Sequence, residues 1–325
     1  MVTGGLGFIG SNFILQLLSK NLDYKIINLD AELYGSNHKN LEDVTNSGNY
    51  RYVKGDITNS SLLEELVSDS DIVVNFAAES FVDRSISNAE PFFKSNVEGV
   101  FKLLEIVRSK KKTIVQISTD EVFGSMKMNS ANEDTRFNPS SPYSATKAAA
   151  ELLVNSYHIT YDCNTIITRC TNNYGPRQFP EKLIPKVIMR AMNNMKIPIY
   201  GNGKNIRDWL FVDDHCAAIL KVIEKGKSGE SYNVSANNEI DNLTIVRKTL
   251  ELMDKPEDLI EYVEDRPGHD FRYSMNSTKI RSHLGWSEKI SFESGLEKTI
   301  QWYLSHQDHW KDASRITENS TPWKE

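Results

Sequence analysis

The sequence is poor in cysteine and contains neither an excess of basic residues nor a long apolar run. Its three cysteines, Cys163, Cys170 and Cys216, are widely spaced and fit neither a zinc site nor a disulfide framework. We therefore expect reduced thiols, no bound metal and a cytoplasmic location.

The balance of charge excludes a general nucleic-acid-binding protein. Because the formal net charge is -6, no domain-wide basic surface is available, and individual arginines would have to hold an anionic small molecule. No apolar run reaches the roughly 18 residues of a membrane span, and no leader with a basic and then an apolar segment is recognisable. We expect neither a nucleic-acid partner nor a membrane anchor.

Apolar segments rich in valine and isoleucine alternate with longer amphipathic stretches. Buried strands are predicted at residues 25–30, 50–56, 71–78, 113–119 and 164–170, and helices between them, such as the one that begins at Asn96. This alternation predicts an α/β fold, a doubly wound parallel (Rossmann) sheet with helices on both faces. After about Tyr174 the alternation loosens, which predicts a smaller mixed α/β substrate-binding lobe.

A glycine-rich loop at the start of the sequence is typical of a phosphate-binding turn. Gly4, Gly7 and Gly10 are spaced so that the turn can be tight, backbone amides can approach a pyrophosphate, and a helix can pack on the preceding strand. The helix predicted to begin near Phe8 points its positive end at the phosphates. The loop therefore predicts a dinucleotide site.

Only Met1, Val2 and Thr3 precede this loop, although a buried strand normally does. Either the first strand is short and its neighbours carry the sheet, or the start is placed too far downstream. Each missing buried apolar residue would cost about 1.5–3 kcal/mol. We favour the late start and expect a fold of reduced stability.

Asp30 ends the second predicted strand, about 20 residues beyond the loop, where a carboxylate can hold the ribose hydroxyls. Neither Ala31 nor Glu32 offers a positive charge for a 2′-phosphate, so NAD is preferred to NADP. We expect residues 1–174, with residues 208–234 returning to them, to form the NAD-binding Rossmann domain. Residues 175–325 should form mainly the substrate-binding domain, with the polar tail from residue 306 loosely held.

A second group of residues points to the oxidation of a sugar hydroxyl. Tyr143 and Lys147 lie one helical turn apart and so share one face of a predicted helix. A nearby ammonium stabilises tyrosinate and lowers a pKa that starts at about 10. The tyrosine then becomes a base that can take the hydroxyl proton while a hydride leaves. Thr119, at the end of the preceding strand, can hydrogen-bond the same hydroxyl.

Several segments, taken in order, resemble the extended short-chain dehydrogenase/reductases. They are TGGLGFIG, NFAAESFVDRSI, STDEVFG, PYSATKAAAE, TRCTNNYGPRQFPEKLIP, PIYGNGKNIRDWLFVDDH and EDRPGHDFRYSMNSTKIRSHLGW. The resemblance extends from Met1 to about Leu304 and is closest to the dTDP-glucose 4,6-dehydratases. It implies an NAD-containing homodimer joined through two long helices, those around Asn96 and Tyr143.

Asp120 and Glu121 are the most discriminating residues of this resemblance. Sugar-nucleotide epimerases of this fold usually carry small or apolar residues there, and GDP-mannose dehydratases usually have serine before the glutamate. Oxidation of C4 acidifies the C5 proton, and the resemblance implies that Glu121 removes this proton while Asp120 protonates the departing C6 hydroxyl. For Asp120 to donate at neutral pH, burial or the charge of Glu121 must raise its pKa.

The resemblance also implies contacts to both ligands. Cofactor contacts fall on Gly4, Gly7, Phe8, Ile9, Gly10, Asp30, Asp56, Ile57, Ala77, Ala78, Tyr143 and Lys147. Substrate contacts fall on Ser80, Arg84, Asn173, Lys182, Leu183, Tyr200, Arg207, Asn242, Arg266 and His269. Arg207 and Arg266 carry planar forks that suit phosphate oxygens, and Tyr200 can stack on a pyrimidine.

Phe81 departs from the family pattern, which usually has histidine at this position beside the sugar pocket, so the affinity for the sugar or the reaction rate can differ.

The favoured interpretation is a lyase that acts on dTDP-glucose and makes a 4-keto-6-deoxy sugar nucleotide, a precursor of deoxysugars such as rhamnose. Alternatives are the same reaction on a UDP-sugar, an NAD-dependent 4-epimerase, and a non-catalytic NAD-binding protein of the same fold. Intact Thr119, Tyr143 and Lys147 argue against the last alternative.

Overall fold

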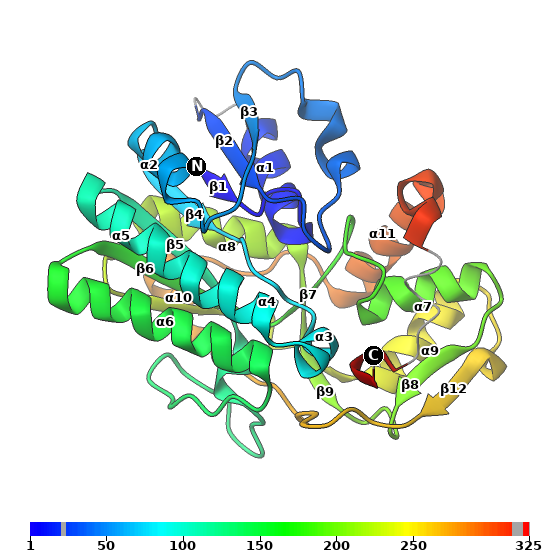
Figure 1. Cartoon of the computed structure of the whole chain (residues 1–325). Helices are drawn as coiled ribbons and strands as arrows, with labels where there is room; N and C mark the ends of the chain where they lie inside the picture. The colour runs from blue at the N-terminus through cyan, green and yellow to red at the C-terminus, as the bar shows by residue number, and fades with distance from the viewer. Residues whose placement is uncertain (21–23, 314–320, 325) are drawn as a thin grey trace.

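The computed structural model describes residues 1–20, 24–313 and 321–324. Within these residues a seven-stranded parallel sheet has the order β3-β2-β1-β4-β5-β6-β10 (Figure 1). Its strands are β1 (Val2–Thr3), β2 (Ile26–Asp30), β3 (Tyr50–Lys54), β4 (Ile72–Asn75), β5 (Thr113–Thr119), β6 (Asn164–Cys170) and β10 (Ser231–Val234). The direction of winding reverses between β1 and β4, as in doubly wound sheets, so the predicted fold class is confirmed.

Helices cover both faces of this sheet (Figure 1). One face carries α1 (Phe8–Ser19), α8 (Val212–Lys225) and α10 (Thr278–Leu284), which share one apolar core. The other face carries α2 (Ser60–Ser68), α5 (Val100–Lys110) and α6 (Pro142–Tyr161), which share a second core. Their buried residues recur at helical spacing, as in Leu103, Leu104 and Val107 of α5, because each helix buries one stripe against the sheet.

The remaining elements form a smaller lobe and the connections to it. The lobe contains a three-stranded sheet of β7 (Asn172–Tyr174), β9 (Ile206–Phe211) and β11 (Glu239–Asp241), and the parallel pair β8 (Ile197–Tyr200) and β12 (Ile260–Val263). It also contains α7 (Leu183–Met192), α9 (Asn242–Leu252) and α11 (Phe292–Ser305). The short helices are α3 (Val82–Ser87), α4 (Glu90–Phe93), the π-helix η2 (Lys94–Gly99), and the 3-10 helices η1 (His38–Val44), η3 (Asp120–Phe123), η4 (Glu257–Leu259), η5 (Gln307–Ala313) and η6 (Pro322–Lys324).

The predicted strands at residues 113–119 and 164–170 have the bounds of β5 and β6. The predictions for residues 50–56 and 71–78 were too long, since β3 and β4 end at Lys54 and Asn75. The chain leaves the sheet at these two points to form loops beside the cavity described below. The helix expected from Asn96 is continuous with the π-helical η2, so it begins earlier than the pattern predicts.

The two-residue strand β1 lies at the centre of the sheet and pairs with both neighbours. Val2 lies opposite Asn28 of β2 and Val74 of β4. Hydrogen bonds continue the pairing at both ends, from the Met1 ammonium to the Ile72 carbonyl (2.7 Å) and from the Gly4 amide to the Leu29 carbonyl (2.8 Å). The glycine loop is therefore anchored to two strands at once.

The expectation of a loosely held tail is wrong for two tryptophans. Trp310 is 5% exposed and packs against Phe179 and Tyr303, with ring centroids 5.8 and 6.4 Å apart. Trp323 is also buried, with its ring 4.8 Å from that of Tyr200. Apolar burial of the two indole rings outweighs the polar composition of the tail, and residues 314–320 lie outside the described part.

Among the described residues, no helix combines the length and the apolar character that a bilayer crossing requires.

We predict that Trp310→Ala lowers the free energy of unfolding by about 3 kcal/mol, because removing a buried tryptophan leaves a cavity. Chemical denaturation followed by circular dichroism measures the change. Tyr262→Ala is the matched control, since Tyr262 is 56% exposed on β12 and its loss should change stability by less than about 0.5 kcal/mol. Equal stabilities of the two variants would contradict a packed tail.

Candidate active site

A cavity of about 280 Å³ lies at the carboxyl ends of β1, β2, β4, β5 and β6. This is the side and the switch point at which doubly wound sheets bind ligands. Many of the predicted residues line it, namely Gly4, Gly7, Phe8, Ile9, Gly10, Asp30, Asp56, Ile57, Ala77, Ala78, Ser80, Thr119, Asp120, Glu121, Tyr143, Lys147, Asn173 and Lys182.

The glycine loop forms one end of the cavity. Helix α1 begins at Phe8, and its N-cap residue Gly7 offers no side-chain acceptor to the first-turn amides. These amides and the positive end of the helix can therefore receive an anion. At Gly10 a Cβ atom would lie 2.5 Å from the Gly4 carbonyl oxygen, so only glycine lets the helix approach the loop this closely.

Asp30 ends β2 at the wall of the cavity. Its carboxylate accepts hydrogen bonds from the Leu6 amide (2.9 Å), the Glu32 amide (2.8 Å) and the Ser36 hydroxyl (2.9 Å). These three donors fix the carboxylate in one orientation, while its two oxygens can still accept from ribose hydroxyls.

The residues present fit a dinucleotide such as NAD. The Thr171 hydroxyl and the Gln178 side-chain carbonyl belong to residues that line the cavity, and both are buried without a partner in the described part of the chain. Buried polar atoms of this kind are normally hydrogen-bonded, so they are available to a ligand. Together with the glycine loop and Asp30, they provide donors and acceptors along the cavity.

The end of β5 supplies two carboxyl groups. The Thr119 hydroxyl donates to one Asp120 oxygen at 3.1 Å, and the other Asp120 oxygen is buried with no partner among the described residues. Burial, with a further contribution from the charge of Glu121, raises the pKa of Asp120 well above its ordinary value. The pKa of Asp120 is therefore shifted in the direction that a proton donor at neutral pH requires.

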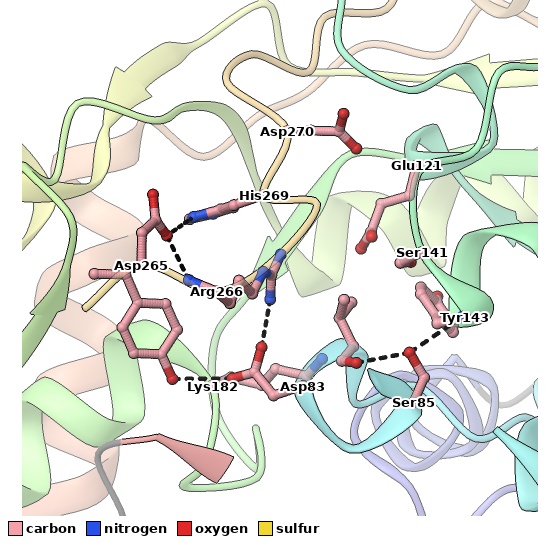
Figure 2. Close-up of polar contacts among 12 residues, drawn as sticks. Asp83, Ser85, Glu121, Ser141, Tyr143, Lys182, Asp265, Arg266, His269 and Asp270 are labelled. Atoms are coloured by element: carbon pink, nitrogen blue, oxygen red, sulfur yellow. Dashed lines mark hydrogen bonds and ion pairs between the residues drawn. The ribbon is translucent and has the colours of Figure 1, made fainter. Parts of the chain in front are cut away.

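Glu121 faces three cations. Burial raises the pKa of its carboxyl group, and the charges of Arg266, Lys182 and Arg207 oppose that rise. Figure 2 shows Glu121 and Arg266 on facing sides of the site, with Tyr143 below Glu121. Two adjacent carboxyl groups therefore differ in environment, since Asp120 lacks this degree of cationic compensation.

Tyr143 lies in the first turn of α6, where its place is fixed by the helix cap. Ser141 and Ser144 form a reciprocal capping box, and Pro142 takes the first helical position. The Tyr143 amide donates to the Ser85 hydroxyl at 3.2 Å, which ties the start of α6 to α3 (Figure 2).

The expectation that Lys147 lowers the pKa of Tyr143 is wrong for the protein groups alone. Burial, helped by the charge of Glu121, raises the pKa of the Tyr143 hydroxyl well above 10. The Lys147 ammonium instead donates to the Ile117 carbonyl at 2.7 Å, and burial lowers the pKa of Lys147 from 10.5 to about 8. Desolvation is the largest cause of the pKa shift in each side chain, because both are buried.

Glu151 continues the face of α6 that carries Tyr143 and Lys147. Its carboxylate accepts a hydrogen bond from the Ser118 hydroxyl (2.5 Å) and pairs with Arg169 of β6 (2.7 Å). All three residues are buried. The charge of Glu151 raises the pKa of Lys147, against the larger effect of burial. Sequence reasoning missed this residue, although its helical spacing from Lys147 is visible in the sequence.

Two predicted substrate residues, Arg266 and Tyr200, meet at Asp83 of α3. Arg266 pairs with the Asp83 carboxylate at 2.7 Å (Figure 2), and the Tyr200 hydroxyl donates to the same carboxylate at 2.9 Å. The Arg266 Nε is buried without a partner in the described chain, so it remains available to an anion. Arg207 donates to the Asp270 carbonyl at 2.9 Å and is 4% exposed.

Other predicted substrate residues do not line the cavity itself. They are Arg84, Leu183, Tyr200, Arg207, Asn242, Arg266 and His269. His269 bonds to Asp265 at 2.6 Å, close to Arg266 (Figure 2). Arg84 turns toward Glu181 and Tyr34, so the expectation that it lies beside the sugar is not supported by its contacts.

Several residues of the site were missed from the sequence. Tyr34, Ser36, Ser95, Gln178 and Phe179 line the cavity. For all of these except Ser95, which lies in η2, the available signal was a position in a loop that follows a strand, because ligand-binding loops of parallel sheets cluster at this edge.

Comparisons with known proteins agree with this geometry. A family model described as GDP-mannose 4,6 dehydratase matches residues 1–299. The low-salt glycan biosynthesis protein Agl12 of Haloferax volcanii is 48% identical over 95% of this chain and 99% of its own. The structure of a dTDP-glucose 4,6-dehydratase from Bacillus anthracis in complex with NAD is 45% identical, with a TM-score of 0.90 over 96% of this chain and 98% of that one. DesIV, a dTDP-glucose 4,6-dehydratase from Streptomyces venezuelae with NAD and TYD bound, is 40% identical, with a TM-score of 0.94 over 96% and 98%.

We predict that Gly10→Ala weakens NAD binding by about tenfold or more, since forcing a methyl group against the Gly4 carbonyl costs about 1–3 kcal/mol. Isothermal titration of the NAD-stripped protein measures the affinity. Gly48→Ala is the matched control, because a Cβ at Gly48 meets nothing within 4 Å. An unchanged affinity for Gly10→Ala would mean that the cofactor does not rest on this loop.

Proposed function

The chain belongs to the GDP-mannose 4,6 dehydratase family, and from that membership we propose that it is a dTDP-glucose 4,6-dehydratase. This NAD-dependent lyase converts dTDP-glucose into dTDP-4-keto-6-deoxyglucose, for deoxysugar (rhamnose-type) biosynthesis. The observation that carries the proposal is the pair of adjacent carboxyl groups that line the cavity with Tyr143, namely a buried Asp120 and a half-buried Glu121. The similarity to dTDP-glucose 4,6-dehydratases over nearly the whole chain supports the same substrate.

The cofactor is held by the Rossmann part of the chain. Residues 1–174, with 208–234, are proposed as the NAD-binding domain and residues 175–325 as mainly the sugar-nucleotide domain. The glycine loop would receive the pyrophosphate and Asp30 the ribose hydroxyls. When bound there, NAD would supply the acceptor for the C4 hydride and the donor for its return to C6, so the cofactor would end the cycle unchanged.

Tyr143 takes the proton of the C4 hydroxyl. Thr119, at the end of β5, is proposed to hydrogen-bond the same oxygen. The Lys147 ammonium, as long as it keeps its charge, is proposed to favour the ionised tyrosine against the larger effect of burial. Burial of Tyr143 keeps water away from this transfer, because the hydroxyl lies in a residue that is 7% exposed.

The elimination of water needs an acid and a base. Glu121 removes the C5 proton, which the C4 ketone has made acidic, and Asp120 gives a proton to the C6 oxygen, which leaves as water. A protonated Asp120 next to an ionised Glu121 suits these roles, since burial favours the neutral form of Asp120 and three cations favour the ionised form of Glu121. C5 then regains a proton as the double bond is reduced.

The diphosphate is assigned to the cationic group of the second lobe. Three cations act on the Glu121 carboxyl group, namely Arg266, Arg207 and Lys182. A planar guanidinium group can bind two phosphate oxygens at once. Tyr200 and His269 lie beside Arg266, where the nucleoside is placed. Leu183, Asn173 and Asn242 are proposed as further nucleotide contacts, and Ser80 as a sugar contact.

A 4-epimerase is disfavoured by the same observation that carries the main proposal. Inversion at C4 needs only an oxidation and a reduction at that carbon, so a buried acid beside a second carboxyl group would have no role in it. The burial of an uncompensated carboxyl group costs stability, and dehydration gives Asp120 a use that epimerisation does not.

The assembly is proposed to be a homodimer through α5 and α6. Large apolar side chains remain exposed along these helices and α4, namely Phe93 (59%), Phe101 (45%), Leu152 (61%), Ile159 (73%) and Tyr161 (49%). A second copy of the same surface would cover them. A cytoplasmic location is also proposed, supported by three buried cysteines that form no disulfide.

We predict that Glu121→Gln abolishes product formation but still permits oxidation at C4, because only the C5 proton transfer loses its base. Mass spectrometry of the quenched sugar nucleotide should reveal the C4-oxidised sugar without the 6-deoxy product. The rate of 6-deoxy product formation should fall by about 100-fold or more. Glu251→Gln, an exposed change on α9, is the control and should leave turnover as it was. Normal product from Glu121→Gln would remove the assigned roles, and no product from the unaltered protein would remove the proposed substrate.

We also predict that turnover falls as pH rises through about 8, where Lys147 loses its ammonium charge. Glu151 raises the pKa of Lys147, so Glu151→Gln should move this alkaline limb to lower pH. A pH series of turnover measures the limb, and a melting curve checks that Arg169, left without its partner, has not unfolded the protein. If the alkaline fall in turnover occurs at the same pH in Glu151→Gln, the fall belongs to a group other than Lys147.

A further inference from the structure

Three aromatic side chains from three separate segments meet beside the cofactor cavity. Tyr34 follows β2, Phe81 precedes α3, and Phe179 belongs to the loop before α7. The Tyr34 ring lies 4.9 Å from both of the other rings, which are 5.5 Å apart, and all three pairs are edge-to-face. Because all three residues line the cavity, this cluster forms part of its wall.

A polar group holds the outer side of the same cluster. The Tyr34 hydroxyl donates to the Glu181 carboxylate, and Arg84 pairs with that carboxylate at 3.1 Å while its guanidinium covers the Tyr34 ring at 3.6 Å. The Glu181 side chain is only 6% exposed, whereas that of Arg84 is 40% exposed, so the carboxylate is shielded from water while the guanidinium is partly solvated. Tyr34 is the one residue that takes part in both the aromatic and the polar contacts.

The cluster connects the two parts of the protein. Tyr34 and Phe81 belong to loops of the Rossmann sheet, whereas Phe179 and Glu181 belong to the segment that enters the smaller lobe. Lys182, next to Glu181, donates to the Ser80 carbonyl at 2.7 Å and lies 4.7 Å over the Phe81 ring. A lysine proposed to meet the substrate therefore touches the wall of the cofactor cavity.

We propose that Tyr34, Phe81 and Phe179 form an aromatic latch that retains the dinucleotide and tightens when a nucleoside diphosphate reaches Lys182. This inference rests on the proposed function, because it needs a resident NAD and a sugar nucleotide. For the cofactor to leave through this wall, Tyr34 must part from both Phe179 and Glu181. These contacts position the wall and take no part in the proton transfers.

The latch also gives a reason for Phe81. A Cβ added at Gly35 would lie 3.0 Å from the Phe81 ring, so the Tyr34 loop already rests directly on this side chain. Phe81 is 6% exposed, and its ring contacts are with aromatic rings and the Lys182 ammonium. A histidine there would bring polar ring nitrogens into an apolar contact, whereas phenylalanine completes the cluster.

The test measures how fast bound NAD exchanges with isotopically labelled NAD, which needs no turnover. Tyr34→Ala should exchange about tenfold faster than the unaltered protein. Tyr34→Phe keeps the ring and should restore most of the retention, so the difference between the two variants isolates the aromatic contacts. Tyr262→Ala, an exposed change on β12, is the control and should exchange at the original rate.

The coupling to substrate is tested in the same assay with dTDP as the probe. Addition of dTDP should slow exchange in the unaltered protein and in Tyr34→Phe but not in Tyr34→Ala. If Tyr34→Ala fails to fold, as shown by its melting curve, Phe179→Leu replaces it with the same expected result. Unchanged exchange in a folded variant, or an equal effect of dTDP on all variants, overturns the latch. Absence of dehydratase activity in the unaltered protein would instead remove the proposed function, while the exchange data would still stand.

Discussion

Burial of titratable side chains at the end of β5 is the constraint on which the proposed chemistry depends. Desolvation, with the charge of Glu121, raises the pKa of Asp120, and desolvation also raises the pKa of Tyr143 and lowers that of Lys147. In water all four groups would return to their ordinary pKa values, and the difference between acid and base would disappear. The smaller lobe contributes to this environment, because the charges of Arg207 and Arg266 act on the two carboxyl groups.

Cations for an anionic substrate have to be placed locally, since the whole chain carries a net charge of -6. Arg266 shows how this is done. Asp83, on a short helix of the Rossmann sheet, compensates the guanidinium at 2.7 Å, and the exposed fractions of the two side chains are 14% and 12%. A buried cation with such a partner is held in position before the substrate arrives. The pair also joins one lobe to the other, so the position of the proposed phosphate site would depend on how the lobes meet.

Much of the fold could be predicted because β5 and β6 are continuous buried runs and the glycine spacing has a specific backbone meaning. The smaller lobe could not, because β7 and β9 are short strands that pair across a long stretch of sequence. Similarly, the meeting of Asp83 with Arg266 and of Tyr34 with Glu181 depends on tertiary structure. The spacing of Tyr143 and Lys147 correctly predicted that they share one helix face. The direction predicted for the Tyr143 pKa was wrong, because the spacing of residues does not reveal how deeply a side chain is buried. The buried Trp310 shows the same limit for a tail of polar composition.

Retention of the cofactor follows from the order of the proposed chemistry. Between the oxidation at C4 and the reduction at C6, both the sugar and the dinucleotide are in altered oxidation states, so loss of either one would stop the cycle. A cavity wall that joins the cofactor loop to the substrate lobe would hinder the loss of either ligand between these two steps. A ligand held by Lys182 and Arg266 would keep the lobes together. Contacts such as Tyr34 with Glu181 would then persist for as long as the sugar nucleotide is bound. Protection of the unfinished reaction would thus be strongest when the substrate is present.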